Sequence, residues 1–369
     1  MPIRLCLIIP TLDRNGAEKQ LTLLATRLPR HLFEVHVCTL TRGGPLETVL
    51  RDAGIPVTHI GKRWKVDPAA FLRLQSYLRK LQPDIVHTWL FAANSYGRVA
   101  ARRVGVPVIV GGERCVDPWK RWHELAIDRR LARSSQRIVT NSSGVRDFYE
   151  RRGLPADKFT VIPNGIEPRA VTTPRRSRAE LLAELDLPAD ARLIGAVGRL
   201  WPQKRYQDLI WATELLSWAC PQSRFVIVGD GPQRWRLERY ARQVKIDQNV
   251  RFLGERDDVE ELLPHFDCFW LASGYEGQSN ALMEAMLAGL PVVVSDIPGN
   301  RDLVIPGESG FIVSVGDSGE FARKARVLLD DSELARKTGQ AARQRMLSEF
   351  SVEKMVARHV LLYQELAQK

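Results

Sequence analysis

Short apolar runs rich in β-forming residues alternate with longer helical patterns along almost the whole chain. In the first half we expect strands at Arg4–Ile9, Glu34–Leu40, Pro56–Ile60, Asp84–Thr88, Val106–Val110, Arg137–Thr140 and Lys158–Ile162. In the second half we expect them at Leu193–Val197, Arg224–Val228, Val250–Leu253, Asp267–Leu271, Val292–Ser295 and Gly310–Val313. This alternation predicts β-α-β units and therefore parallel sheets.

The chain has 369 residues, which suits two domains of ordinary size. Pro163-Asn164-Gly165 is typical of a turn, and a stretch rich in Pro, Arg and Thr follows it to about Arg178. We therefore expect an α/β fold of two doubly wound, Rossmann-like parallel-sheet domains that face each other across a cleft. Such sheets bind ligands outside the carboxyl ends of their strands, so the loops that follow the strands are the places to look for function.

Cysteine usage and hydropathy predict a soluble cytoplasmic protein. Arg4 interrupts the first apolar run, which argues against a signal peptide, and no apolar stretch reaches the roughly 18 residues that span a bilayer. The five cysteines are odd in number and form no C-x-x-C pair, as is typical of reduced core thiols. They are Cys6, Cys38, Cys115, Cys220 and Cys268.

Positive charge is concentrated in the first half. Residues 1–170 carry 28 Lys and Arg against 15 Asp and Glu, whereas the remaining residues carry 26 against 28. A solvated arginine-rich surface, a nucleic-acid-binding face and an anionic membrane face all fit this asymmetry.

The sharpest motif is EGQSN at residues 276–280, which precedes an apolar helix expected at Ala281–Ala288. Free N–H groups at such a helix start favour an anion. Glu284 lies inside the apolar helix, where burying a carboxylate is costly unless it binds something. Glu276 and Glu284 would suit sugar hydroxyls, although a loop charge and an exposed helix residue would show the same spacing.

Other candidates also follow expected strands. Arg199 and Lys204 lie in the loop after Leu193–Val197 and could clamp a diphosphate, although a surface pair would look the same. In the first half, Asn15-Gly16 forms a strand–helix loop that could cradle an anion. His87, Glu113 and Arg114 are expected at strand ends facing the cleft, with a structural role as the alternative for His87.

Missing motifs narrow the class of enzyme. The chain has neither G-x-G-x-x-G nor G-x-x-x-x-G-K-[ST], which disfavours a nicotinamide-dependent Rossmann enzyme and a P-loop NTPase. It has neither a D-x-D pair nor a Cys/His metal set, so we expect no metal and no cofactor. Arg199 and Lys204 would then have to neutralise any departing diphosphate.

Six strings, in the family's order and at its spacing, resemble glycosyltransferase family 4, the retaining GT-B enzymes. They are NGAEKQ, VIPNGIEP, VGRLWPQK, FVIVGDGP, VRFLGERDDV and EGQSNALMEAMLAGLPVVVSDIPGNRDLV. The resemblance extends from about residue 3 to residue 365. We place an acceptor-binding domain at 1–168 and a nucleotide-sugar-binding domain at 169–350. As the family implies, a C-terminal helix at 351–369 should pack back on the first domain, and the domains should close by a hinge around Asn164–Arg178.

The resemblance implies a role for each matching residue. Arg199 and Lys204 bind the diphosphate of a nucleotide sugar, Glu284 binds the ribose hydroxyls, and Gly16 touches the phosphate from the first domain. The donor sugar and its phosphate are held by Glu276, Gly277, Gln278, Ser279 and Asn280. The catalytic candidates are Glu276, Lys204, Arg199 and His87. The family reaction is metal-independent and retains the anomeric configuration, with the departing phosphate helping to deprotonate the acceptor.

The chain departs from the family pattern at two places. Many members have two glycines where this chain has Asn15-Gly16, so the backbone approach there is expected to be looser. Many members also carry a histidine after the strand that corresponds to Pro107–Val110, where this chain has Glu113-Arg114. Glu113, Arg114 and His87 are therefore candidates for the acceptor side of the cleft.

Tryptophan and basic residues occur together twice in the basic half, a combination suited to lipid headgroups. Half-buried tryptophans with solvated arginines would give the same pattern. The candidate membrane-surface residues are Arg63, Trp64, Lys65, Trp119, Lys120, Arg121 and Trp122.

Together these features predict a retaining, metal-independent glycosyltransferase of hexosyltransferase type. It would move a sugar from a nucleotide sugar, with a UDP-sugar favoured, to a lipid-linked or polysaccharide acceptor in cell-surface glycan or lipopolysaccharide assembly. It would act as a peripheral protein on the inner face of the cytoplasmic membrane. An epimerase or phosphorylase on the same fold is an alternative. A nucleic-acid-binding protein is another, but no recognised module or stacking platform supports it, so no nucleic-acid partner is expected.

Overall fold

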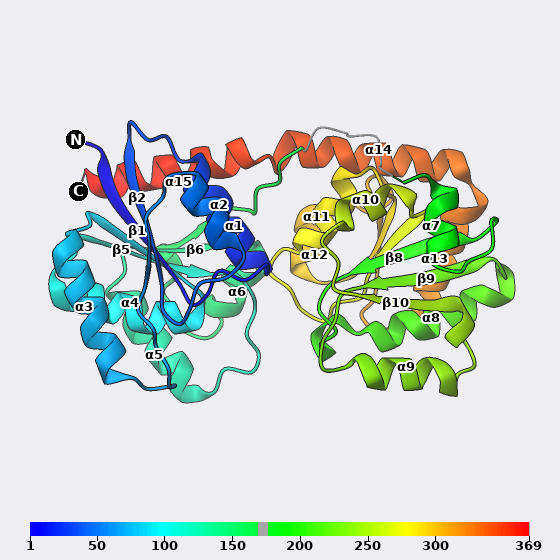
Figure 1. Ribbon diagram of the computed structural model, residues 1–369, viewed down its shortest axis with the longest axis horizontal. Coiled ribbons are helices and arrows are strands. Elements are labelled where there is room, and N and C mark those ends of the chain that lie inside the picture. Colours follow the sequence, from blue (N-terminus) through cyan, green and yellow to red (C-terminus); the bar gives the residue numbers. More distant parts are fainter. Residues whose placement is uncertain (169–175, 369) are drawn as a thin grey trace. The chain divides into compact units, whose positions relative to one another are not determined.

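The computed structural model describes residues 1–168 and 176–368 (Figure 1). The chain divides into two compact units, one formed by Met1–Gly165 with Val352–Lys369 and the other by Ile166–Ser351. The divisions drawn from the sequence, after residues 168 and 350, lie close to these points. The hinge expected around Asn164–Arg178 includes residues 169–175, which lie outside the described residues.

A seven-stranded parallel sheet forms the centre of the first unit, in the order β3-β2-β1-β4-β5-β6-β7. Its strands are β1 (Ile3–Ile9), β2 (Phe33–Thr39), β3 (Val57–His59), β4 (Ile85–Trp89), β5 (Val108–Glu113), β6 (Arg137–Thr140) and β7 (Phe159–Val161). Its helices are α1 (Gly16–Arg27), α2 (Leu46–Asp52), α3 (Pro68–Leu81), α4 (Leu90–Val104), α5 (Trp122–Arg133), α6 (Ser143–Glu150) and α15 (Val352–Ala367).

Helices cover both faces of this sheet because its central strands are apolar on both sides. Along β1, Leu5 and Leu7 pack against α1, α2 and α15, whereas Cys6 and Ile8 pack against α3 and α4. Figure 1 shows these helices in two layers, one on each face of the sheet. Since α15 belongs to the first unit, the last segment of the chain completes the core that the first segment begins.

The second unit repeats the scheme with six parallel strands in the order β10-β9-β8-β11-β12-β13. They are β8 (Arg192–Val197), β9 (Ser223–Val228), β10 (Val250–Gly254), β11 (Cys268–Leu271), β12 (Val292–Ser295) and β13 (Phe311–Val313). Its helices are α7 (Arg178–Glu184), α8 (Tyr206–Ala219), α9 (Arg234–Gln243), α10 (Val259–Leu262), α11 (Asn280–Leu287), α12 (Pro298–Leu303), α13 (Ser318–Asp330) and α14 (Ser332–Glu349).

Every strand predicted from the sequence is present, and the predicted fold of two Rossmann-like units is confirmed. In each sheet the order reverses beside the first strand, between β1 and β4 in one unit and between β8 and β11 in the other. Ligands of open α/β sheets bind outside the carboxyl ends of the strands at such reversals. Among the described residues, no helix has both the length and the apolar character needed to cross a bilayer.

Candidate functional site

In the second unit, the strand reversal brings the loops after β8 and β11 together. The loop after β8 contains a short 3-10 turn at Pro202–Lys204, and the loop after β11 leads into α11. Gln203 ties the two loops, because its side-chain Nε2 donates to the carbonyl of Tyr275 (2.7 Å) and its own carbonyl accepts from the N–H of Gly274 (2.9 Å). The structure thus joins two clusters that lie about seventy residues apart in the sequence.

An ion pair between Lys204 and Glu276 lies at the centre of this junction. The Lys204 Nζ lies 2.5 Å from Glu276 Oε1, and the hydroxyl of Ser273 donates to the same oxygen at 2.8 Å. The two charged side chains are mostly covered, at 16% and 10% exposure. A cation and a carboxylate are therefore held together where the sheet is expected to bind its ligand. Ser273 was not among the sequence candidates, although its place two residues after β11 and three residues before Glu276 was a usable signal.

The start of α11 provides backbone donors beside this pair. Ser279 caps the helix, since its hydroxyl accepts from the N–H of Leu282 at 3.4 Å. Gly277, Gln278 and Ser279 are buried, whereas Asn280 and Glu284 are partly exposed. The helix begins at Asn280, one residue earlier than the sequence predicted, so Glu276 lies in the loop and Glu284 in the second turn.

Close backbone contacts surround the two loops. A side chain on Gly229 would lie 2.2 Å from the carbonyl oxygen of Gly198, and both glycines have positive φ angles, +131° and +152°. A side chain on Gly299, in α12, would lie 1.8 Å from the carbonyl oxygen of Gly277. The backbone around Glu276 therefore rests on glycines at positions where no side chain fits.

Arg199 lies in the same loop as Lys204 but takes no part in the ion pair. Its guanidinium is exposed and stands 4.6 Å from the ring centre of Trp201. A cation on an aromatic face at the surface can leave that position at little cost, since such contacts are worth about 0.5–1 kcal/mol. Of the two candidate cations in the loop after β8, the structure thus holds Lys204 in place and leaves Arg199 loosely held.

In the first unit, Gly16 is the first residue of α1, directly after the loop that follows β1. Glu18, the third residue of α1, is buried and accepts from the Thr11 hydroxyl (3.1 Å) and from Asn15 Nδ2 (3.4 Å). Burial is the main cause that raises the pKa of Glu18. The loop before Gly16 is therefore tied to the helix by a side chain that the sequence analysis did not select.

The expectation that His87 faces a cleft is wrong. His87 is the third residue of β4, not its end, and its ring is fully buried among Trp89, His359 and Tyr363. Its Nδ1 lies 2.7 Å from the hydroxyl oxygen of Tyr363, in α15. Burial is the main cause that holds the pKa of His87 well below its usual value. An uncharged, enclosed imidazole under a helix is a core residue, which corrects its assignment as a catalytic candidate.

Glu113 and Arg114 are also turned inward, contrary to expectation. Glu113 accepts from Asn94 Nδ2 at 2.8 Å, and only 2% of the residue is exposed. The guanidinium of Arg114 lies 4.4 Å from the ring centre of Trp89 and donates to the side-chain oxygen of Asn164. Burial lowers the pKa of Arg114 to about 9. These two side chains hold the end of β5 in place and are not exposed to an acceptor.

The candidate membrane-surface residues divide into two groups. Trp64, Trp119 and Trp122 are 67%, 55% and 78% exposed, and their neighbours Arg63, Lys65 and Arg121 are exposed as well. Both segments contact the first half of α4: the Trp119 ring packs on Phe91, and Tyr96 accepts from the N–H of Asp67.

Lys120 is the exception, and its assignment to the surface is wrong. Its side chain is fully buried, with Nζ 2.9 Å from Asp128, 3.4 Å from Asp117 and 3.5 Å from Glu113. It also donates to the Tyr149 hydroxyl at 2.8 Å, and Arg98 lies 3.4 Å from Asp128. We call this set the Lys120 cluster; its members are Lys120, Arg98, Glu113, Asp117, Asp128 and Tyr149.

Comparison with known proteins assigns the chain. Residues 14–170 match a family model described as Glycosyltransferase Family 4, and residues 177–345 match one described as Glycosyl transferases group 1. A putative glycosyltransferase of Bacillus subtilis, EpsD, is 32% identical over 85% of this chain and 85% of its own length. The chain belongs to glycosyltransferase family 4. It is a glycosyltransferase, as the sequence predicted.

Another relative and two solved structures are similar to this chain over nearly its whole length. The UDP-Gal:alpha-D-GlcNAc-diphosphoundecaprenol alpha-1,3-galactosyltransferase of Escherichia coli is 29% identical over 91% of this chain and 90% of its own length. The structure of Anabaena HepE in complex with UDP and glucose superposes with a TM-score of 0.87 at 22% identity, covering 98% of this chain and 100% of HepE. Sucrose-phosphate synthase of Thermosynechococcus elongatus gives 0.80 at 20% identity, with 99% of each chain covered. The last two show the fold, which is the GT-B arrangement of two Rossmann-like units.

Proposed function

We propose that this glycosyltransferase takes a UDP-sugar as donor and transfers the sugar, with retention and without a metal, to a lipid-linked acceptor in cell-surface glycan assembly. The observation that carries the donor part is the Lys204–Glu276 pair at the strand reversal of the second unit. The name of the E. coli relative, with its UDP-galactose donor and diphosphoundecaprenol acceptor, supports the substrate classes.

Lys204 and Glu276 divide the work in this proposal. Lys204 supplies the fixed positive charge that a diphosphate needs as it departs, and a cation held in place before the reaction costs no reorganisation during it. Glu276 has only one of its two oxygens occupied by Lys204 and Ser273, so the carboxylate keeps acceptor capacity for the hydroxyls of a sugar. Arg199 joins the diphosphate by leaving the Trp201 ring, and Glu284 takes the ribose.

Retention follows, in this proposal, from attack on the same face of the sugar that the diphosphate leaves. The departing phosphate oxygen accepts the proton of the acceptor hydroxyl, so no side chain has to act as the base. This assignment suits a chain in which His87, beside the first-unit strand reversal, is enclosed and uncharged.

Thermal stabilisation by nucleotides tests the donor part. A ligand that binds the folded state raises the midpoint temperature of unfolding. At a hundredfold excess over Kd it adds about 2.7 kcal/mol to the free energy of unfolding. We expect UDP and UDP-sugars to stabilise the protein with or without a chelator, and GDP and ADP to do so weakly. Loss of the shift with EDTA would contradict metal independence, and a larger shift with GDP would contradict the choice of UDP.

Lys204→Ala should abolish most of the UDP shift and of the transferase activity while the fold survives. Lys337→Ala is the matched control, because Lys337 is a surface lysine of the same unit that also faces a carboxylate, Glu333 at 3.4 Å. Equal effects of the two variants would remove the assignment of Lys204 as the diphosphate ligand. Proton NMR of the product reads the anomeric configuration and thereby tests retention.

The second part of the proposal is peripheral binding to the inner face of the cytoplasmic membrane through Trp64, Trp119 and Trp122. Tryptophans exposed beside basic residues suit the headgroup region of an anionic bilayer. Co-sedimentation with phosphatidylglycerol vesicles should fall in Trp119→Ala/Trp122→Ala and remain in Trp218→Ala, since Trp218 is 82% exposed but belongs to the second unit. Absence of vesicle binding by the wild type at low salt would refute this part alone.

A further inference from the structure

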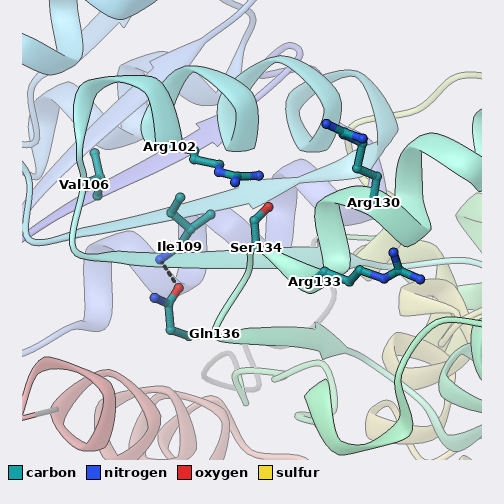
Figure 2. A pocket seen from close by; sticks show the side chains of 7 residues that line it. All are labelled: Arg102, Val106, Ile109, Arg130, Arg133, Ser134 and Gln136. Atoms are coloured by element: carbon teal, nitrogen blue, oxygen red, sulfur yellow. Dashed lines mark hydrogen bonds between the residues drawn. The ribbon is translucent and has the colours of Figure 1, made fainter.

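A pocket of about 500 Å³ lies in the first unit beside the amino ends of β5 and β6. Val106, Ile109 and Gln136 line it from the sheet side, and Arg102 of α4, Arg130 and Arg133 of α5, and Ser134 complete it. Figure 2 shows Arg102 extending from α4 toward Ser134, with Arg130 and Arg133 on the α5 side of the pocket. This is the edge of the sheet opposite the carboxyl ends of the strands, so the pocket is separate from the expected sugar-transfer chemistry.

Three arginine residues line this pocket, and no carboxylate is among its lining residues. Arg102, Arg130 and Arg133 are all exposed, and within the described parts of the chain none of them forms an ion pair. The acidic residue nearest to them along α5, Asp128, points into the core and is held by Lys120 and Arg98. The pocket therefore carries a concentrated positive charge that the protein itself does not compensate.

The floor of the pocket is fixed by its own hydrogen bonds. Gln136 accepts from the N–H of Ile109 at 2.8 Å and donates to the carbonyl of Pro107 at 3.0 Å, so its amide has no freedom to turn (Figure 2). Ser134 donates to the carbonyl of Leu131 at 3.0 Å and keeps its oxygen as an acceptor. A fixed floor beside three mobile arginine side chains suits a tetrahedral phosphate, because each guanidinium can donate two parallel hydrogen bonds to phosphate oxygens.

The orientation of α5 connects this pocket with the exposed tryptophans. Asp128, Leu131 and Ala132 are buried, so residues 122, 129 and 133, which are seven and four positions apart on the other side of the helix, face outward. The helix has 12 residues and is therefore about 18 Å long. Its outer face carries Trp122 at one end and Arg133, one of the residues that line the pocket, at the other, as expected of a helix that lies on a headgroup layer.

We propose that the pocket formed by Arg102, Arg130 and Arg133 binds the phosphate group of an anionic lipid headgroup. This inference rests on the membrane association proposed above and assigns a specific lipid contact to it. Free phosphate esters share the same chemistry, so the experiment includes both sources.

Two pairs of variants separate a pocket from general surface charge. Arg102→Gln should weaken binding to vesicles of phosphatidylglycerol in phosphatidylcholine about fivefold, since one basic residue at such a surface contributes about that much. Arg103→Gln is its control, because Arg103 is the next residue of α4 but stacks on Phe71 and does not line the pocket. Its effect should stay below about twofold.

The second pair is Arg130→Gln/Arg133→Gln against Arg79→Gln/Lys80→Gln. Both double variants remove two positive charges from the last turn of an exposed helix of the same unit, α5 or α3. We expect a loss of about 30-fold in vesicle binding for the first and less than about twofold for the second. A change in the free energy of unfolding that both double variants share measures only the effect of removing cations from a helix end.

Soluble glycerol phosphate identifies the source of the phosphate. Thermal stabilisation of the wild type by millimolar glycerol phosphate that is lost in Arg130→Gln/Arg133→Gln supports a free phosphate ester as the ligand of the same pocket. Equal losses in a variant and its control, or no loss in any variant, would overturn the proposal. Stabilisation by UDP is measured in every variant, so failure of the proposed donor site is read separately from failure of the pocket.

Discussion

Two cations and three carboxylates share one enclosed space in the Lys120 cluster. Lys120→Met leaves Asp128, Glu113 and Asp117 around a missing cation, and removal of one partner from a buried ion pair typically costs about 3–5 kcal/mol. Arg121→Met, at the next and exposed position, should change the free energy of unfolding by about 0.5 kcal/mol or less. Urea denaturation of the two variants measures the difference, and similar values for both would contradict the burial of Lys120.

The same cluster gives the protein a pH dependence of known sign. Burial, with the nearby charge of Glu113, raises the pKa of Asp128 to about 6, although Lys120 and Arg98 oppose the shift. The folded protein therefore binds a proton that the unfolded chain releases above about pH 4, so this group's contribution to stability is lost as the pH rises from about 4 to about 6. Burial raises the pKa of Asp117 in the same direction.

Asp128→Asn should remove most of this slope, on the order of 3 kcal/mol across the window. Asp147→Asn is the matched control, because the Asp147 side chain is 40% exposed and pairs with Arg146 on α6. The free energy of unfolding is measured in urea from pH 4 to pH 7. A slope unchanged in Asp128→Asn would show that Asp128 is ionised throughout that range.

For individual residues, the sequence predicted the type of residue at a position better than the direction in which its side chain points. Alternation along β4 turns Ile85, His87 and Trp89 to the side covered by α15. The sequence predicted a strand that ends at Thr88, one residue before its observed end, and so placed His87 near an edge. In the loop before α5, no period relates Lys120 to the exposed tryptophans beside it. Its direction is set by Asp128 and Tyr149, which lie 8 and 29 residues further along the chain.

At the scale of elements, the loop between β11 and α11 depends on α12, the helix that lies against it. Gly299 is the second residue of α12, and a methyl group there would meet the carbonyl oxygen of Gly277 at 1.8 Å. Gly299→Ala should therefore push the Gly277–Ser279 backbone out of place. We expect a loss of about 1–3 kcal/mol in stability and of most of the UDP shift.

Gly319→Ala is the control for this substitution. Gly319 is likewise the second residue of a helix, α13, but the nearest atom to its added methyl group would be Asp317 Oδ1, at 3.5 Å. Since alanine favours a helix over glycine, this variant should be neutral or slightly stabilising. Calorimetry with and without UDP compares the two, and an unchanged UDP shift in Gly299→Ala would refute the backing role of α12.

Elements were the level at which sequence reasoning succeeded most fully. The alternation of strand and helix patterns predicted all the strands, because each central strand is apolar on both faces and each helix is apolar on one face. It also placed Lys204 and Glu276 after strands, but not side by side, since that requires the strand order in which β8 and β11 are neighbours. Strand order follows from packing across the whole sheet, which local pattern does not contain.

At the scale of the whole molecule, α15 links the end of the chain to its beginning. Tyr363 is fully buried in the first unit, where its ring packs edge-on against Phe33 and its hydroxyl oxygen meets His87. Tyr363→Ala should cost about 3–5 kcal/mol, as large aromatic truncations in a core do. Leu361→Ala, on the same helix but 67% exposed, should cost about 0.5 kcal/mol or less.

The location of the damage is the sharper test of this prediction. In Tyr363→Ala, limited proteolysis should cleave first between Met1 and Gly165, because that segment shares the weakened core, and Ile166–Ser351 should persist as a resistant fragment. Cleavage that begins in the second unit would mean that α15 stabilises a different part of the protein.

The place of α15 also bears on how the protein is made. A ribosome delivers residues 1–165 first, but their core lacks Val352, Met355 and Tyr363 until the final helix leaves the exit tunnel. The second unit, Ile166–Ser351, is continuous in the chain and can complete itself during synthesis. The first unit thus matures after the second, and its unfinished apolar face is available to a chaperone while Ile166–Ser351 is being translated.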